Sequence, residues 1–189
     1  MHTVGILLAA GRGRRFDPSG VADKLLQRLP DGDAVVVASA RTLLAVLPRV
    51  LAVVPPSDRG VAQALRTLGC EVTVCPDADT GMGASLAHAV AASLPAAQAW
   101  VIALGDMPFV EKATIRALCA ALAGGAEIAA PVANGRRGNP VGFGPAHLPA
   151  LLALSGDEGA RHIVRGSAVV EVAVDDPGIF RDIDTAADL

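Results

Sequence analysis

Short apolar runs alternate with helix-like segments through the first two thirds of the chain. Each run is too short for a helix and ends at glycine, proline or polar residues, which is typical of buried strands. Strands are predicted at residues 4–10, 50–54, 71–75, 100–104 and 128–132, and helices at residues 34–47, 57–68, 84–94 and 112–123. Strands that alternate with helices form βαβ units, with a mostly parallel sheet between two helical layers. The pattern therefore predicts an α/β fold.

The alternation loosens after residue 134. A short strand at residues 141–144, a helix near residues 149–154 and a strand at residues 168–174 are predicted there. No linker, repeat or low-complexity tract divides the chain, and its 189 residues suit one domain. We therefore expect residues 1–189 to form a single domain with a sizeable core.

Composition excludes several classes of function. Hydrophobic residues make up 52% of the chain and charged residues 19%, which argues against disorder. With four Phe, one Trp and no Tyr, the core must be aliphatic, and no aromatic platform is available for stacking nucleic-acid bases. The net charge of −3 gives no electrostatic footprint for DNA or RNA. No nucleic-acid partner is expected.

The cysteines and apolar segments indicate the compartment. Cys70, Cys75 and Cys119 are odd in number and lack metal-ligand spacing, so buried, inert thiols in a reducing compartment are expected. The apolar stretch at residues 4–10 is too short for a signal peptide, and no segment approaches the length of a membrane span. A cytoplasmic protein without a membrane partner is the expectation.

A glycine- and arginine-rich loop follows the first predicted strand. Gly11 and Gly13 let the backbone approach a ligand closely, and Arg12, Arg14 and Arg15 offer planar donors that match phosphate oxygens. The spacing fits neither a Walker A loop nor the dinucleotide fingerprint, which would need a small residue where Phe16 stands. The loop is thus predicted to hold a polyphosphate. The alternative is an ordinary strand-to-helix turn with a solvated arginine face.

Aspartates follow the fourth predicted strand and end the chain. Asp106 comes directly after the strand at residues 100–104, where ligands bind at the carboxyl edge of a parallel sheet. Mg²⁺ usually binds one or two carboxylates together with phosphate oxygens and waters. Asp106 could instead cap a helix or turn, and Asp184 or Thr185 could cap a last helical turn. His88 and His162 lie in helical contexts and are interpreted as ordinary helix residues.

The sequence Leu8-Ala9-Ala10-Gly11-Arg12-Gly13-Arg14-Arg15-Phe16, followed by Asp23-Lys24-Leu25, resembles the signature of the MobA-like nucleotidyltransferases. Within that family it is most similar to the molybdenum cofactor cytidylyltransferases. The resemblance implies a single Rossmann-like α/β domain of three layers, of the nucleotide-diphospho-sugar transferase type. It also implies transfer of a nucleoside monophosphate to a phosphorylated acceptor with release of pyrophosphate. Residues 1–134 would then form the nucleotide-binding half and residues 135–189 the acceptor-side half.

The resemblance implies a nucleotide site as well. Its members would be Leu8, Ala9, Ala10, Gly11, Arg12, Gly13, Arg15, Lys24, Gly81, Gly83, Ser85 and Asp106. Arg15, Lys24 and Asp106 would be catalytic, with Arg15 and Lys24 on the triphosphate. Residues 81–86 resemble the segment that lines the base and ribose pocket in the family, although a plain helix N-terminal turn also fits them. Ala10, at the third place of L-A-A-G, is similar to the cytidylyl type and indicates CTP.

Metal and acceptor residues are implied by three further matches. Asp106 in Gly105-Asp106-Met107-Pro108 and Asp182 in the C-terminal Asp-Ile-Asp-Thr segment would bind Mg²⁺, with Asp184 as the alternative to Asp182. The implied acceptor residues are Arg137, Asn139, Pro140, Asp157 and Arg161, although each could belong to a surface turn. The implied acceptor is molybdopterin carrying molybdenum, and a molybdoenzyme would receive the product. GTP, a sugar-phosphate acceptor and a non-catalytic cofactor carrier remain the alternatives.

Overall fold

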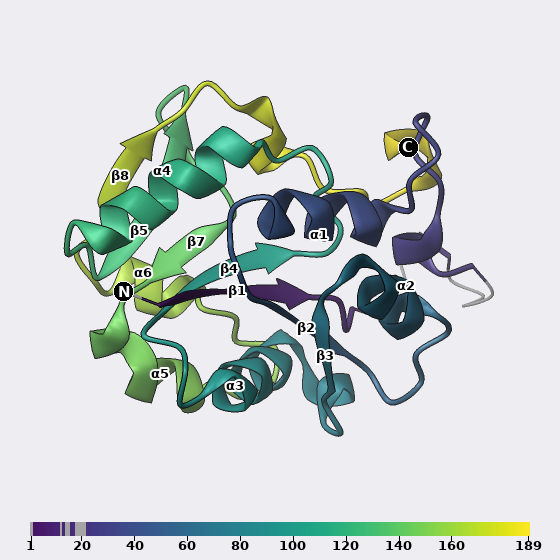
Figure 1. Cartoon of the computed structure of the whole chain (residues 1–189), viewed down its shortest axis with the longest axis horizontal. Helices are drawn as coiled ribbons and strands as arrows, with labels where there is room; N and C mark the ends of the chain where they lie inside the picture. The colour runs from purple at the N-terminus through teal and green to yellow at the C-terminus, as the bar shows by residue number, and fades with distance from the viewer. Residues whose placement is uncertain (1, 12, 14–15, 18–21) are drawn as a thin grey trace.

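A central sheet of eight strands carries helices on both of its faces (Figure 1). The structure is a computed structural model, and it describes residues 2–11, 13, 16–17 and 22–189. The strands are β1 (Thr3–Leu8), β2 (Val50–Val54), β3 (Glu71–Val74), β4 (Ala99–Leu104), β5 (Ile128–Ala133), β6 (Arg136–Arg137), β7 (Val141–Phe143) and β8 (Val170–Ala173). The α-helices are α1 (Val35–Leu44), α2 (Val61–Leu68), α3 (Met82–Ser93), α4 (Lys112–Ala123), α5 (Leu148–Leu152) and α6 (Arg161–Arg165). Short 3-10 turns lie at Lys24–Leu26 (η1), Ala78–Thr80 (η2), Pro145–His147 (η3), Pro177–Phe180 (η4) and Ala186–Asp188 (η5).

The strands follow the order β3-β2-β1-β4-β7-β5-β6, and β8 pairs with β5. The pairs β1–β2, β1–β4, β2–β3 and β5–β8 are parallel. β7 runs antiparallel to both β4 and β5, and β6 runs antiparallel to β5. The predicted α/β domain with a mostly parallel sheet is therefore confirmed. The two antiparallel strands come from the region where the alternation of elements loosens.

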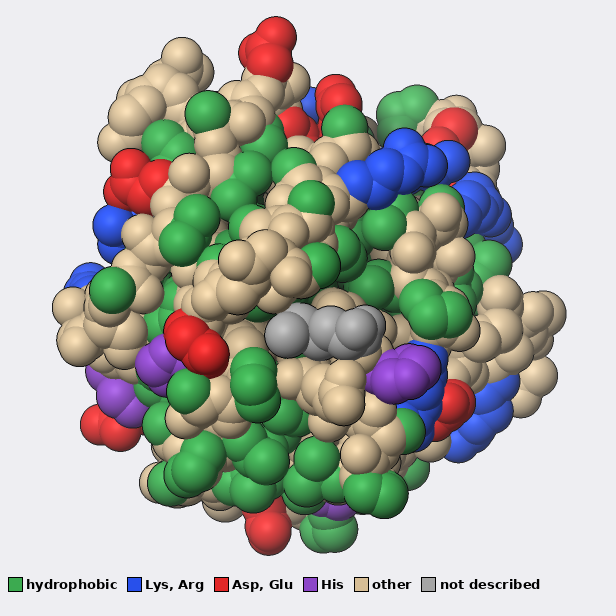
Figure 2. Space-filling view, turned by 60° about the vertical axis from the view of Figure 1, so that its left-hand side comes forward, with side chains coloured by type: hydrophobic (Ala, Val, Ile, Leu, Met, Phe, Trp, Pro, Cys, Tyr) green, Lys and Arg blue, Asp and Glu red, His purple; other side chains and the backbone are tan. Residues whose placement is uncertain are grey.

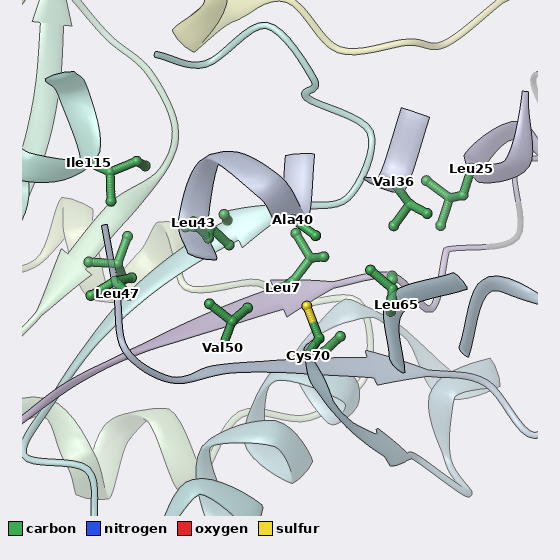
Figure 3. Close-up of a cluster of buried hydrophobic side chains, with 14 of the residues drawn as sticks. Leu7, Leu25, Val36, Ala40, Leu43, Leu47, Val50, Leu65, Cys70 and Ile115 are labelled. Atoms are coloured by element: carbon green, nitrogen blue, oxygen red, sulfur yellow. The ribbon is translucent and has the colours of Figure 1, made fainter. Parts of the chain in front are cut away.

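The core lies in two apolar layers, one on each face of the sheet. Successive side chains of a strand point to opposite faces. In β4, Val101 packs with the helices α1, α2 and α4, whereas Trp100 and Ile102 pack with α3, α5 and α6. Figure 3 shows the first layer, in which Leu7 of β1 lies close to Ala40 and Leu43 of α1. Since β1, β2 and β4 are covered on both faces, they read as continuous apolar runs in the sequence.

The predicted start of the second helix is wrong. Ser57 was expected to be the N-cap residue, but α2 begins at Val61, and Gly60 occupies its N-cap with a φ of 120° that favours glycine. The carboxylate of Asp58 accepts hydrogen bonds from the backbone N–H groups of Gly60 and Ala62, both at 3.2 Å. The side chain of Asp58 therefore caps the N-terminus of α2, since it reaches the first turn. The predicted end at Gly69 is confirmed by its left-handed conformation.

The three cysteines are free thiols in this structure. Cys70 and Cys75 are buried, as predicted, whereas Cys119 is only partly buried. Burial raises the pKa of the Cys70 thiol to about 11, because the thiolate would lose its hydration. Cys70 is thus held as an unreactive thiol at neutral pH.

The molecular surface shows no extended basic face in the view of Figure 2. Lys and Arg side chains there are interspersed with Asp and Glu among the residues drawn in colour. Within the described part of the chain, no helix has the length and apolar character that crossing a membrane would require.

Candidate active site

The glycine-rich loop and Asp106 lie at the same edge of the sheet because their strands are neighbours. β1 and β4 pair in parallel along their whole length, and the Gly105 N–H donates to the carbonyl of Leu8 at 2.9 Å. A cavity of about 390 Å³ opens beyond these strand ends. Of the predicted nucleotide-binding residues, those that line it are Leu8, Ala10, Gly11, Gly13, Lys24, Gly81, Ser85 and Asp106. Ala9 instead lines an adjoining cavity that shares Ala10 and Gly11.

The C-terminal segment brings two more carboxylates close to Asp106. The Ile183 N–H donates to the carbonyl of Asp106 at 2.8 Å, and the Ile183 side chain is fully buried in the core. In an extended segment, the residues on either side of a buried one point the other way. Asp182 and Asp184 therefore turn outward, and one carboxylate oxygen from each of Asp106, Asp182 and Asp184 lies within 4.8 Å of the others.

This trio of carboxylates fits a hard divalent cation. Carboxylate oxygens are the ligands that Mg²⁺ and Mn²⁺ prefer. The sequence treated Asp182 and Asp184 as alternatives, but the structure brings both to Asp106. Asp184 is the less exposed of the two. The assignment of ligands stays a prediction, with three candidate residues in place of two.

Lys24 contacts two of these three carboxylates. Its Nζ atom is 2.7 Å from Asp106 Oδ2 and 3.6 Å from Asp184 Oδ1. The turn η1 positions it, because the Asp23 carboxylate accepts from the Leu25 N–H at 2.9 Å and Leu25 is buried in the core. The lysine is thereby held at the edge of the cavity, with its side chain only 12% exposed.

Close packing of the backbone explains why residues 81 and 83 are glycines. A Cβ atom on Gly81 would lie 2.3 Å from the backbone of Gly156, and one on Gly83 would lie 2.5 Å from the Glu158 carbonyl oxygen. The Gly83 N–H donates to the Gly156 carbonyl at 2.8 Å. The sequence interpretation assigned both glycines to the nucleotide site. In the structure both let the loop at residues 155–158 pack against the start of α3, and Gly81 also lines the cavity. Gly83 does not line the cavity, whereas the buried Ser85 does.

A second cavity of about 690 Å³ adjoins the first. The two share the residues Leu8, Met82, Leu104 and Asp157. Of the predicted acceptor residues, Arg137, Asn139, Asp157 and Arg161 line this second cavity. Pro140 does not, because it is buried and contacts a small void beside Ser39 and Met107.

The sequence analysis missed Arg165, which also lines the second cavity. Arg165 follows Arg161 by four residues in α6, and residues at that spacing share a helix face. The signal was present, since the sequence placed His162 in a helical context, but Arg165 was not singled out. Arg137 is paired with Glu171 at 2.8 Å, whereas neither Arg161 nor Arg165 has an ion-pair partner among the described residues.

A buried carboxylate that the sequence did not single out anchors the C-terminal segment. Asp176, which is 2% exposed, accepts hydrogen bonds from the Thr114 hydroxyl at 2.6 Å and the Glu111 N–H at 2.9 Å. It also accepts from the Gly178 N–H at 2.8 Å. These bonds join η4 to the N-terminus of α4. The segment that carries Asp182 and Asp184 thus starts from a fixed point.

The end of the chain is fixed by a second carboxylate and an aromatic contact. The Thr185 hydroxyl and the N–H groups of Thr185 and Asp184 all donate to Asp188, and these bonds hold the pKa of Asp188 below its usual range. The Arg181 guanidinium lies 3.9 Å from the centroid of the Phe109 ring. The position of Asp184 is therefore fixed by the hydrogen bond of its own N–H group and by the contacts of the residues before it.

The predicted roles of Arg12, Arg14 and Arg15 fall on residues outside the described part of the chain. Their contacts with phosphate stay predictions from the sequence.

A parallel sheet whose carboxyl edge carries a glycine-rich loop, a lysine and clustered carboxylates defines a phosphate-handling α/β protein. The model of the MobA-like NTP transferase domain matches residues 5–172, so the chain belongs to this family and is a nucleotidyltransferase. The predicted resemblance to the family is confirmed.

Solved structures with the same fold cover nearly the whole chain. Rv0371c from Mycobacterium tuberculosis is 29% identical, with a TM-score of 0.83 over 100% of this chain and 95% of that one. A structure of the same protein with manganese gives 29% identity and a TM-score of 0.79, covering 100% and 96%. Mth528, a nucleotidyl transferase from Methanothermobacter thermautotrophicus, is 23% identical, with a TM-score of 0.81 over 99% and 94%. A search of curated proteins found no match.

Proposed function

We propose that the protein transfers CMP from CTP to the terminal phosphate of molybdenum-bearing molybdopterin and releases pyrophosphate. The observation that carries the proposal is that Lys24, Asp106 and the glycine-rich loop line one cavity, which adjoins a second cavity, while Asp182 and Asp184 lie beside Asp106. Residues 1–134 would supply most of the nucleotide side and residues 135–189 most of the acceptor side. Met82 and Asp157 line both cavities and would lie at their boundary.

In this reaction an acceptor phosphate oxygen forms a bond to the α-phosphorus of CTP. The bond from that phosphorus to the bridging oxygen breaks, and pyrophosphate leaves with the electron pair. A phosphate nucleophile is already ionised at neutral pH, so no general base is needed. In agreement with this, no histidine or cysteine of the described residues lines either cavity. The chain's task is to position the two substrates and stabilise charge.

Individual residues would divide this task. Backbone N–H groups near Gly11 and Gly13 would bind the triphosphate, and the ammonium group of Lys24 would stabilise the leaving pyrophosphate. Asp106, Asp182 and Asp184 would hold Mg²⁺, which when bound supplies positive charge to the phosphate oxygens. The manganese complex of the 29% identical relative supports a divalent cation in this role.

CTP is proposed as the donor because Ala10, which matches the cytidylyl type, lines the nucleotide cavity. Among CTP, GTP, UTP and ATP with Mg²⁺, we expect CTP to give the largest rise in the melting temperature of the protein, since only a ligand of the folded state stabilises it. A clear preference for GTP would overturn this choice. The transfer itself is tested by pyrophosphate release with CTP and acceptor together. Binding of CTP without pyrophosphate release would favour the carrier alternative.

The second cavity is proposed to bind the acceptor. Apolar side chains of Leu86, Ile102 and Phe143 line part of it, and Arg161 and Arg165 add cationic groups suited to an anionic molecule. Replacing Arg161 or Arg165 by alanine is expected to raise the KM for the acceptor by about tenfold, because each loses a charge-assisted contact. The Kd of CTP, measured by calorimetry, should not change.

Arg116 provides a matched control, because it is exposed on α4, which packs on the opposite face of the sheet from α6. Arg116→Ala should leave both constants at their wild-type values. Equal effects of all three substitutions on the acceptor would contradict the proposed acceptor site.

A further inference from the structure

The ammonium group of Lys24 contacts two of the three clustered carboxylates. Its Nζ atom lies 2.7 Å from Asp106 Oδ2 and 3.6 Å from Asp184 Oδ1, and both carboxylates belong to the trio that fits a divalent metal. The side chains of Lys24 and Asp106 are 12% and 23% exposed. Partly withdrawn from water, these charges interact more strongly than they would on an open surface.

A divalent cation and this ammonium group would compete for the same oxygens. Mg²⁺ binds oxygen ligands at about 2.0–2.1 Å, so a metal on Asp106 would lie within a few ångströms of Lys24 Nζ. Two cations that close repel each other, and the repulsion weakens the binding of the metal. Metal binding is therefore favoured when Lys24 has another anion to contact.

The glycine-rich loop places such an anion within reach. A Cβ atom on Gly13 would lie 3.4 Å from the Lys24 Cβ, so the stem of the lysine already packs beside the loop. Gly11, Gly13 and Lys24 line one cavity. Rotation of the lysine side chain, without movement of the backbone, could carry Nζ from the carboxylates toward a triphosphate bound at the loop.

We propose that Lys24 acts as a tethered cation that fills the metal position in the free enzyme and transfers to the triphosphate when metal and nucleotide bind. This inference rests on the proposed function, since it takes the nucleotide to bind at the loop. The metal and the nucleotide would then bind cooperatively. Each increases the affinity of the protein for the other, and by linkage the two increases are equal. The free enzyme would hold metal weakly, and the complete site would form only with nucleotide present.

The test measures Mn²⁺ affinity by the electron paramagnetic resonance signal of free Mn²⁺, with and without α,β-methylene-CTP, which cannot be cleaved between its α- and β-phosphates. The Mn²⁺ that the analogue binds without protein is measured separately and subtracted. In the wild type, the analogue should tighten Mn²⁺ binding by about tenfold or more. Lys24→Met keeps the length of the side chain and removes its charge. Without nucleotide, this variant should bind Mn²⁺ about tenfold more tightly than the wild type, and the analogue should add little. Equal or weaker Mn²⁺ binding by the variant overturns the proposal.

The chain offers a matched control, because Lys24 and Lys112 are its only lysines and Lys112 is exposed at the start of α4. Lys112→Met should bind Mn²⁺ as the wild type does. A second readout needs no variant of the site: ¹³C-dimethylation labels both lysines and the α-amino group, and Lys112→Met assigns the two lysine signals. Mg²⁺ alone should shift the Lys24 signal and leave the Lys112 signal in place, and an unmoved Lys24 signal at saturating Mg²⁺ would contradict displacement. Neither readout depends on turnover, so a failure of the proposed reaction appears separately as missing pyrophosphate release.

Discussion

Asp106→Asn is expected to lower the turnover number by about 10²–10³-fold while leaving the protein folded. The substitution keeps the shape of the side chain but removes one of the three negative charges that face the proposed metal. The charge that it removes is also the one that faces Lys24 Nζ, which lies 2.7 Å from Asp106 Oδ2. The rate of pyrophosphate release measures the loss, and weaker Mn²⁺ binding should accompany it.

The fold should survive this substitution because Asp106 holds the C-terminal segment through its backbone. The contact is between the Asp106 carbonyl and the Ile183 N–H, and asparagine retains it. Asp77→Asn is a suitable control, since Asp77 is exposed and lines neither cavity. A turnover number for Asp106→Asn within twofold of the Asp77→Asn value would reject the role of Asp106 in metal binding.

Asp176→Ala is expected to lower the free energy of unfolding by about 3 kcal/mol. The alanine leaves three donors without an acceptor in a nearly water-free position: the Thr114 hydroxyl and the N–H groups of Glu111 and Gly178. It also removes a negative charge at the N-terminus of α4, where the helix dipole favours one. Urea unfolding, with an unchanged slope against denaturant, measures the loss.

Further substitutions separate the contribution of the hydrogen bonds to stability from that of the Asp176 charge. Asp176→Asn keeps one acceptor oxygen and should lose less stability than Asp176→Ala, while Thr114→Val should lose about 1 kcal/mol. The folded Asp176→Asn protein should also bind Mn²⁺ more weakly, because η4 leads to Asp182 and Asp184. Asp175→Asn, a change at an exposed neighbour, is the control. A loss for Asp176→Ala below about 0.5 kcal/mol would show that Asp176 is not the anchor.

The regular part of the fold could be predicted from local patterns. The run at residues 50–54 forms β2, and the segment at residues 112–123 forms α4, both with the predicted bounds. A short apolar run indicates a strand that is buried on both faces of the sheet, and a glycine such as Gly69 indicates a helix that ends in a left-handed conformation. The placement of Asp106 beside the glycine-rich loop also follows from sequence, because parallel neighbours end at the same edge of a sheet.

Other features depend on contacts between distant segments. Nothing local distinguishes the buried Asp176 from the exposed Asp175, since its three donors include Thr114 and Glu111, more than sixty residues away. The sequence interpretation assigned Gly83 to the ligand. The structure shows that the backbone of the loop at residues 155–158 occupies the space that a side chain at Gly83 would need, and no local sequence pattern indicates that contact.

The sequence by itself determined the α/β class, the strands beneath the site and the family. The reason is that short stretches of residues are enough to indicate buried strands and turns. Only the tertiary structure decided that Asp182 and Asp184 both reach Asp106, that Lys24 lies between two of these carboxylates, and that Arg165 joins the second cavity. The physical reason is that electrostatic contacts depend on distances of a few ångströms. Those distances are set by how the C-terminal segment packs across the end of the sheet, with Ile183 in the core and Asp176 at the start of α4.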